Sequence, residues 1–134
     1  MCRIYVVCSL TLSVLDQSPI AGGADAARAF DESLKLAQRC EALGYHRYWL
    51  AEHHGSNTFV GASPEVLIAH IAAGTSHIRI GSGGVMLMHY SPLKVAENFR
   101  VLEALHPGGG GAHVQRSRRK THSLASFAYR ARHA

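Results

Sequence analysis

The stretch YHRYWLAEHHG, residues 45–55, decides the fold of this chain. Its aromatic and apolar first part is typical of a strand, and its polar, glycine-ended second part is typical of the loop that follows one. LSVLD at 12–16 and IRIGS at 78–82 repeat this character. A longer segment with apolar residues at helical spacing follows each stretch, which predicts strand–helix units around a parallel sheet. The predicted strands lie near 11–16, 46–51 and 78–82.

Helix signals mark the segments that follow the strands. Asp25 can cap the first helix, and Gly44 suits the left-handed turn that often ends one. Serine followed by proline, at Ser63 and again at Ser91, can open the other two helices. In the last helix one apolar face is predicted for Val95, Phe99, Leu102 and Leu105. The predicted helices lie near 25–43, 64–76 and 92–105. Right-handed crossovers should place all three on one side of a sheet whose strands follow in sequence order.

Charge divides the 134 residues into two parts. Residues 1–105 hold eight basic and all nine acidic side chains, whereas 106–134 hold six basic side chains and no acidic one. Residues 108–111 are four glycines, which weaken a strand where a fourth one would begin. We therefore expect an N-terminal extension (1–10), one α/β domain (11–108) and a disordered basic tail (109–134).

Composition narrows the class of protein. No window approaches the roughly 18 apolar residues of a membrane span, and the three cysteines form no C-x-x-C pair. A soluble, cytoplasmic protein without a membrane partner is expected. The basic residues of 116–120 could touch nucleic acid electrostatically, but no aromatic residues interleave them, so a nucleic-acid partner is not favoured.

Polar or very small residues stand at the carboxyl end of every predicted strand, where ligands bind in parallel α/β folds. They are Asp16-Gln17-Ser18, Glu52-His53-His54 and Ser82-Gly83-Gly84. Imidazole suits proton transfer near neutral pH, yet two histidines bonded to backbone at a strand end would look the same. Paired glycines would let a flat ligand reach the backbone, yet an ordinary turn also explains them. No further ligands stand at metal-binding spacing, so no metal site is predicted.

Together these motifs resemble the start of the bacterial luciferase-like, flavin-dependent monooxygenases. The resemblance runs almost continuously over residues 11–108. It rests on LSVLDQSPI (12–20), GYHRYWLAEHHG (44–55), SPEVLIAH (63–70), RIGSGGVML (79–87), YSPLKVAE (90–97) and LEALHPG (102–108).

What the resemblance implies is a (β/α)8 TIM barrel, of which this chain would hold the first three βα units. It also implies binding of reduced FMN, use of molecular oxygen to oxidise a small organic substrate, a separate flavin reductase as partner, and often a homo-oligomer. His53 matches the family's active-site histidine and would be catalytic, moving protons at the flavin. Glu52, Ser82, Gly83 and Gly84 would lie against the cofactor, with Gly83-Gly84 at a place where relatives can carry a cis peptide bond.

The departure from the family begins after residue 108, where glycines and a basic tail replace the family's fourth strand. A frameshifted or truncated gene is one hypothesis for this change. We expect such a chain to bind flavin weakly and to be inactive by itself. The alternative is a non-catalytic fragment or interaction module. The substrate and the reductase stay undefined by the sequence.

Overall fold

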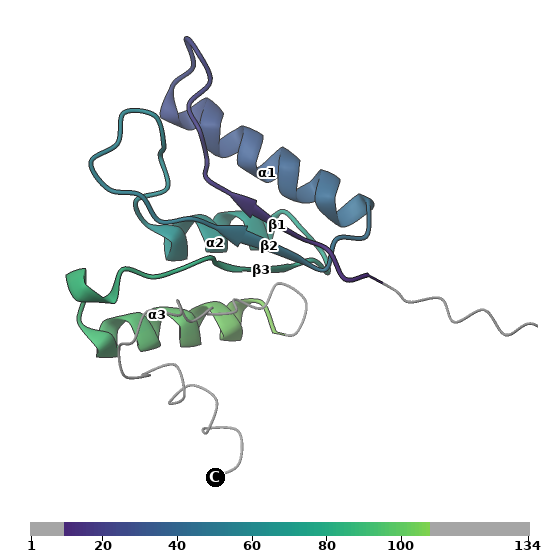
Figure 1. Cartoon of the computed structure of the whole chain (residues 1–134). Coiled ribbons are helices and arrows are strands. Elements are labelled where there is room, and N and C mark those ends of the chain that lie inside the picture. The colour runs from purple at the N-terminus through teal and green to yellow at the C-terminus, as the bar shows by residue number, and fades with distance from the viewer. Residues whose placement is uncertain (1–9, 108–134) are drawn as a thin grey trace, which may run out of the picture.

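The computed structural model describes residues 10–107 and contains a three-stranded parallel sheet in the order β1-β2-β3 (Figure 1). Ser13 pairs with Arg47, and Arg47 in turn pairs with Arg79, so the first residues of the three strands are aligned across the sheet. The elements in chain order are β1 (Ser13–Asp16), α1 (Ala26–Ala42), β2 (Arg47–Leu50), α2 (Pro64–Ala73), β3 (Arg79–Ser82), the 3-10 helix η1 (Leu87–His89) and α3 (Pro92–Leu105). The predicted order and direction of the strands are confirmed.

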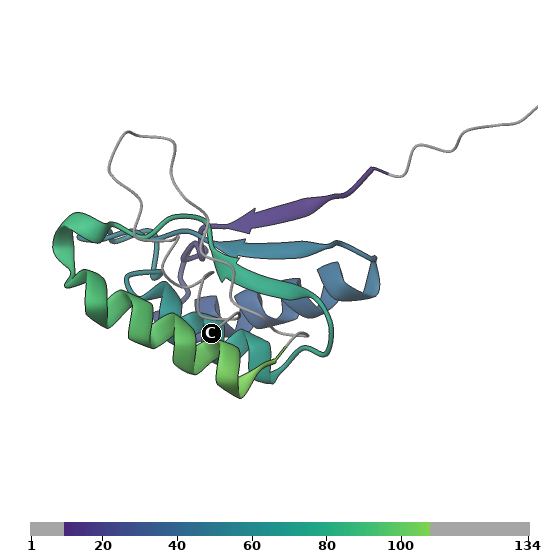
Figure 2. The same ribbon diagram turned by 90° about the horizontal axis from the view of Figure 1, so that it is seen from below.

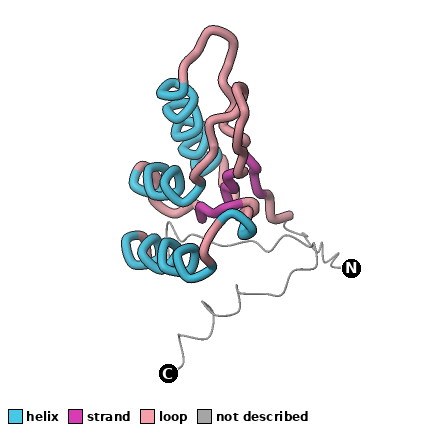
Figure 3. Tube along the Cα trace, turned by 90° about the vertical axis from the view of Figure 1, so that its left-hand side faces the viewer, coloured by secondary structure: helices cyan, strands magenta, loops and turns pink. Residues whose placement is uncertain are grey.

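All three α-helices lie on one side of the sheet. Figure 2 shows them beneath the strands, and Figure 3 shows the same single layer from another direction. This is the arrangement of a barrel sector, in which each right-handed crossover returns the chain on the same face. The prediction of a one-sided helix layer is confirmed.

The hydrophobic core fills the space between the sheet and this helix layer. Tyr48, Leu50 and Ile80 point into it from the strands and are fully buried. Central helix α2 is buried most heavily, because it packs against β3 and against both neighbouring helices. The remaining members of the core are Ala37, Cys40, Leu67, Ile68, Ile71, Ala72, Ile78, Phe99 and Leu102.

Helix ends follow the sequence signals only in part. Asp25 caps α1 by accepting a hydrogen bond from the amide of Arg28 at 2.8 Å, and Gly44 has the left-handed φ of 77°. Ser63 and Ser91 precede the first residues of α2 and α3 as expected, but neither side chain makes a capping hydrogen bond, and α2 ends at Ala73 rather than near residue 76. Leu105 was expected on the apolar face of α3 but is 62% exposed, because no described element covers the last turn.

The opposite face of the sheet has a different character. Successive strand residues alternate between faces, so Leu15, Arg47, Trp49 and Arg79 point away from the helices. The guanidinium of Arg47 lies 5.9 Å from the centre of the Trp49 ring. Burial and the neighbouring Arg47 lower the pKa of Arg79, while Glu103 opposes that shift. We call these residues the open face.

Within residues 10–107, no helix is long and apolar enough to cross a bilayer. The predicted basic tail, and all but the last residue of the predicted N-terminal extension, lie outside the described residues.

Candidate functional site

Asp16, at the end of β1, is the centre of a buried set of hydrogen bonds that we call the Asp16 tie. Its carboxylate accepts hydrogen bonds from the Tyr48 hydroxyl (2.7 Å) and the Ser18 amide (2.8 Å). The Tyr48 hydroxyl also lies 3.1 Å from the backbone oxygen of Ser33 in α1, which can share the same proton. Burial, followed by the hydrogen bond to Asp16, raises the pKa of Tyr48 well above its usual range. The first of the three predicted polar strand ends therefore joins β1, β2 and α1.

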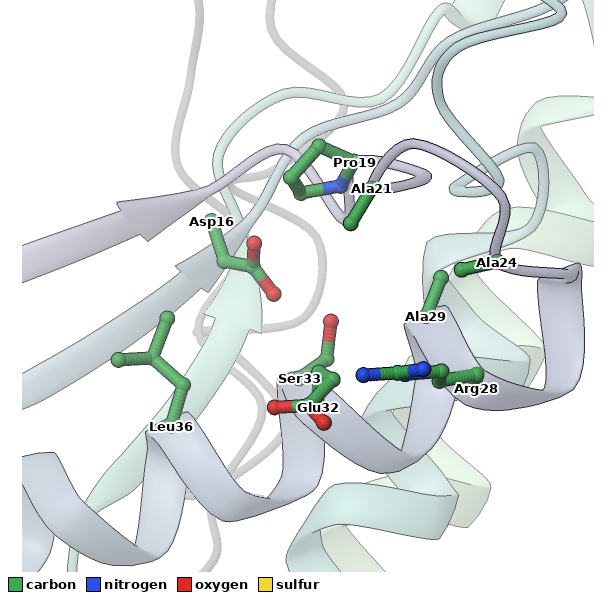
Figure 4. A pocket seen from close by; sticks show the side chains of 9 residues that line it. All are labelled: Asp16, Pro19, Ala21, Ala24, Arg28, Ala29, Glu32, Ser33 and Leu36. Atoms are coloured by element: carbon green, nitrogen blue, oxygen red, sulfur yellow. The ribbon is translucent and has the colours of Figure 1, made fainter.

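A hollow of about 450 Å³ opens beside this tie (Figure 4). It lies between the end of β1 and the first half of α1, at the edge of the sheet. Its lining combines small apolar side chains with Arg28 and Glu32, and none of the five predicted site residues contributes to it. The hollow and the five predicted site residues are thus in different places.

Glu52 organises the end of β2. Its side chain is only 1% exposed. One carboxylate oxygen, Oε2, accepts the backbone amide of Met86 at 2.8 Å. The other, Oε1, lies 2.6 Å from the Tyr90 hydroxyl and 2.7 Å from Nε2 of His54. The hydrogen bond to Glu52, together with burial, raises the pKa of Tyr90 to about 12. Both oxygens are therefore occupied by groups from the loop after β3 and from His54.

His53 has a separate environment. Its ring stacks on Phe59 with centroids 4.7 Å apart, and its backbone amide donates to the oxygen of Gly61. The Nδ1 atom is buried and has no hydrogen-bond partner among residues 10–107. An unpartnered buried imidazole nitrogen is costly in an apolar setting, so it suggests a group that binds there.

Beyond β3, Ser82 and the glycine pair shape a narrow backbone turn. The Ser82 hydroxyl donates to the backbone oxygen of Gly84 at 2.6 Å. A Cβ atom at Gly83 would come within 2.6 Å of the Leu15 side chain, whereas one at Gly84 would meet no atom within 4 Å from the other described residues. The peptide bond joining the two glycines is trans, as are all others among the described residues. Gly84 therefore borders open space beside the backbone.

Two of these features could border a flat ligand such as a flavin. Gly84 offers an uncovered stretch of backbone, and His53 offers an unsatisfied buried nitrogen. The roles of His53, Glu52, Ser82, Gly83 and Gly84 stay predictions. The described hydrogen bonds of the Glu52 carboxylate are all made with other residues of the chain.

The sequence did not indicate a role for Tyr90, or a role for His54 separate from that of His53. Tyr90 precedes the proline that opens α3, in the motif YSPLKVAE, so its place in the loop after a strand was the available signal. His89 lies edge-on to His54, with ring centroids 5.7 Å apart. Within the described range, no group of three or more His, Cys, Asp or Glu side chains has the arrangement of a metal site.

Known proteins share this architecture. A family model described as luciferase-like monooxygenase matches residues 10–125. An N-acetyl-S-alkylcysteine monooxygenase of Bacillus subtilis (strain 168) is 54% identical over 99 residues, which are 74% of this chain and 30% of that protein. The chain thus spans about a third or less of the length of the curated relatives it matches.

Two solved structures extend the comparison to the fold. The crystal structure of apo-MsnO8 has a TM-score of 0.75 and 46% sequence identity, over 90% of this chain and 36% of that one. A type II Baeyer–Villiger monooxygenase in complex with FMN, the oxygenating constituent of the Pseudomonas putida 3,6-diketocamphane enzyme, has a TM-score of 0.73 at 22% identity, over 93% of this chain and 34% of that one. The chain therefore belongs to the luciferase-like monooxygenase family, and its three βα units match part of that family's TIM-barrel fold.

Proposed function

We propose that this protein serves the oxidation of a small organic substrate by reduced FMN and molecular oxygen, with a separate reductase supplying the reduced flavin. The observation that carries the proposal is the unpartnered Nδ1 of His53, in the same family motif as Glu52 and in a fold that sets the loops after β2 and β3 side by side. A relative named as a monooxygenase and a structure of the same fold in complex with FMN support this class of reaction.

In this proposal each described residue has a limited task. Gly84 lets the ring approach the backbone, because no side chain intervenes. His53 holds or moves a proton at Nδ1, and Phe59 fixes the plane of its ring by stacking. Glu52 keeps the two loops together through the Met86 amide and Tyr90. When bound, the reduced flavin would supply the electrons for the reaction with oxygen.

The chain by itself is not expected to turn over. TIM barrels commonly hold phosphate with loops after strands seven and eight, and the described residues contribute β1 to β3. Catalytic groups must also be held within about 0.5 Å of their working positions. The open face gives the strand ends no opposite wall among residues 10–107. We therefore assign the reaction to a complete barrel that contains this segment.

A chimera tests this assignment. The matching 99 residues of the N-acetyl-S-alkylcysteine monooxygenase are replaced by those of this chain, and turnover with reduced FMN is measured. We expect an active chimera, and a loss of about tenfold or more in kcat/KM for Gly84→Ala, which corresponds to about 1.4 kcal/mol of transition-state binding. The added methyl group meets no atom of the other described residues within 4 Å, so this segment should tolerate it.

Gly22→Ala is the matched control, because a Cβ there also meets nothing within 4 Å in the described part of the chain but lies in the loop before α1. A folded chimera that binds no FMN would contradict the proposal. Equal activity of the Gly84 and Gly22 variants would remove Gly84 from the site.

A further inference from the structure

Three polar atoms converge beyond the ends of β2 and β3. Oε1 of Glu52 lies 2.6 Å from the Tyr90 hydroxyl and 2.7 Å from Nε2 of His54, and these last two atoms are 3.2 Å apart. Glu52 and Tyr90 are 38 positions apart in the chain, so the fold rather than local sequence assembles the cluster.

The distances determine which atoms donate. A carboxylate oxygen accepts more than one hydrogen bond, so Oε1 can receive both the phenol proton and a proton on Nε2. If Tyr90 instead donated to Nε2, an unprotonated nitrogen would face the carboxylate oxygen at 2.7 Å, lone pair against lone pair. The phenol is also 0.6 Å nearer to Glu52 than to His54. Both facts favour a proton on Nε2, donated to Glu52.

The neighbours leave one ring nitrogen of the cluster, Nδ1 of His54, without a described hydrogen bond. Glu52 is buried and anchored by the Met86 amide. Tyr90, with its pKa raised to about 12 by Glu52, burial and the charges of Glu52 and Glu65, keeps its proton. The His54 side chain is 40% exposed, and its Nδ1 has no hydrogen-bond partner in the described part of the chain. The His89 ring lies in an edge arrangement with the His54 ring, with centroids 5.7 Å apart.

We propose that His54 is a proton-exchange site distinct from His53, acting through Nδ1, with Glu52 and Tyr90 as its positioning residues. The ligand it would serve is a small organic molecule with an oxyanion or an acidic hydroxyl group. Doubly protonated His54 gives its Nδ1 proton to the ligand oxygen. The N–H electron pair stays on Nδ1, an O–H bond forms, and the Nε2 proton remains on the imidazole, bonded to Glu52. The use of this proton in oxygenation rests on the proposed function; the placement of the proton does not.

The test is nitrogen NMR of the 134-residue chain, selectively labelled at histidine and recorded without flavin. At neutral or higher pH, Nε2 of His54 should show the signal of a protonated ring nitrogen and Nδ1 that of an unprotonated one. On acidification, the Nδ1 signal should move to the protonated position while the Nε2 signal stays in place. A proton on Nδ1 at high pH, with Nε2 titrating, would overturn the proposal.

Two variants separate the partners. Tyr90→Phe should keep the proton on Nε2 but let it exchange faster with water, whereas a flip of tautomer in this variant would show that Tyr90 donates to His54 and would overturn the assignment. Glu52→Gln should lose the single tautomer; retention of it would remove Glu52 from the site. Tyr45→Phe is the control, because no hydrogen bond involves that hydroxyl within residues 10–107. If Glu52→Gln does not fold, the parent chain and Tyr90→Phe still decide. The chimera tests the proposed function, whereas the spectra test the position of the His54 proton. Either test can give a negative result while the other gives a positive one.

Discussion

The two faces of the sheet differ in burial and in charge. On the helix side, Tyr48, Leu50 and Ile80 are fully buried among apolar side chains from all three helices. On the open face, Leu15 is 57% exposed, and two arginines occupy neighbouring positions of β2 and β3. Like charges in register destabilise a sheet unless something else compensates them.

The difference shows which face of the sheet this segment can cover with its own residues. The helix side is packed as in a folded domain, because each crossover brings its helix onto the same face. In a TIM barrel the other face is the interior, packed by side chains from all eight strands. The residues of the open face are therefore suited to a wall that the described part of the chain does not supply.

The largest expected effect comes from matched leucines on the two faces. Leu50→Ala should destabilise the fold by about 2–5 kcal/mol, because it removes a fully buried side chain from the core. Leu15→Ala should cost about 1 kcal/mol or less, because that side chain is largely exposed. Urea unfolding followed by circular dichroism measures both. Equal losses would break the comparison.

A smaller effect is expected at the Asp16 tie, the set of hydrogen bonds at the end of β1. Tyr48→Phe removes the shorter of the two hydroxyl hydrogen bonds to the buried carboxylate of Asp16 and should cost about 1–3 kcal/mol. Tyr45→Phe, which removes a hydroxyl with no described hydrogen bond, should stay within about 0.5 kcal/mol of the parent. The same urea titration applies, and a Tyr48 variant as stable as the Tyr45 variant would refute the tie.

The smallest effect concerns pH. Burial opposes ionisation of Glu41, but hydrogen bonds from the amides of His77, Ile78 and Ser76 outweigh it and lower the pKa of that carboxyl. Because the folded-state pKa lies below the unfolded value, the carboxylate contributes stability above the unfolded pKa of about 4.3, and this contribution is lost as pH falls through the folded pKa.

Glu41→Gln should therefore reduce the loss of thermal stability between pH 5 and pH 3 that the parent chain shows. The control is Glu97→Gln on α3, a carboxylate for which no hydrogen bond or ion pair is described. Melting curves across this pH range decide the matter. Identical pH dependence of the Glu41 variant and the parent would contradict the assignment.

The sequence predicted the fold, whereas the contacts between side chains at the strand ends needed the structure. Strand order, the one-sided helix layer and the Asp25 cap follow from local signals: alternation of segments, crossover handedness and a side chain able to reach free amides. The Glu52–Tyr90–His54 cluster depends on how two loops meet after folding, and no spacing in the chain encodes a contact across 38 residues. Asp16 was equally ambiguous, because a buried hydrogen-bonded carboxylate and a ligand-binding one look alike in a sequence.

The most direct test of the account uses the chain's single tryptophan, Trp49, which lies on the open face. Acrylamide quenching of its fluorescence is measured in the 134-residue chain and in the chimera after other tryptophans are replaced by phenylalanine. If the open face is the interior of a barrel, Trp49 should be quenched readily in the chain and several-fold less in the chimera. Equal quenching in two folded proteins would contradict that claim.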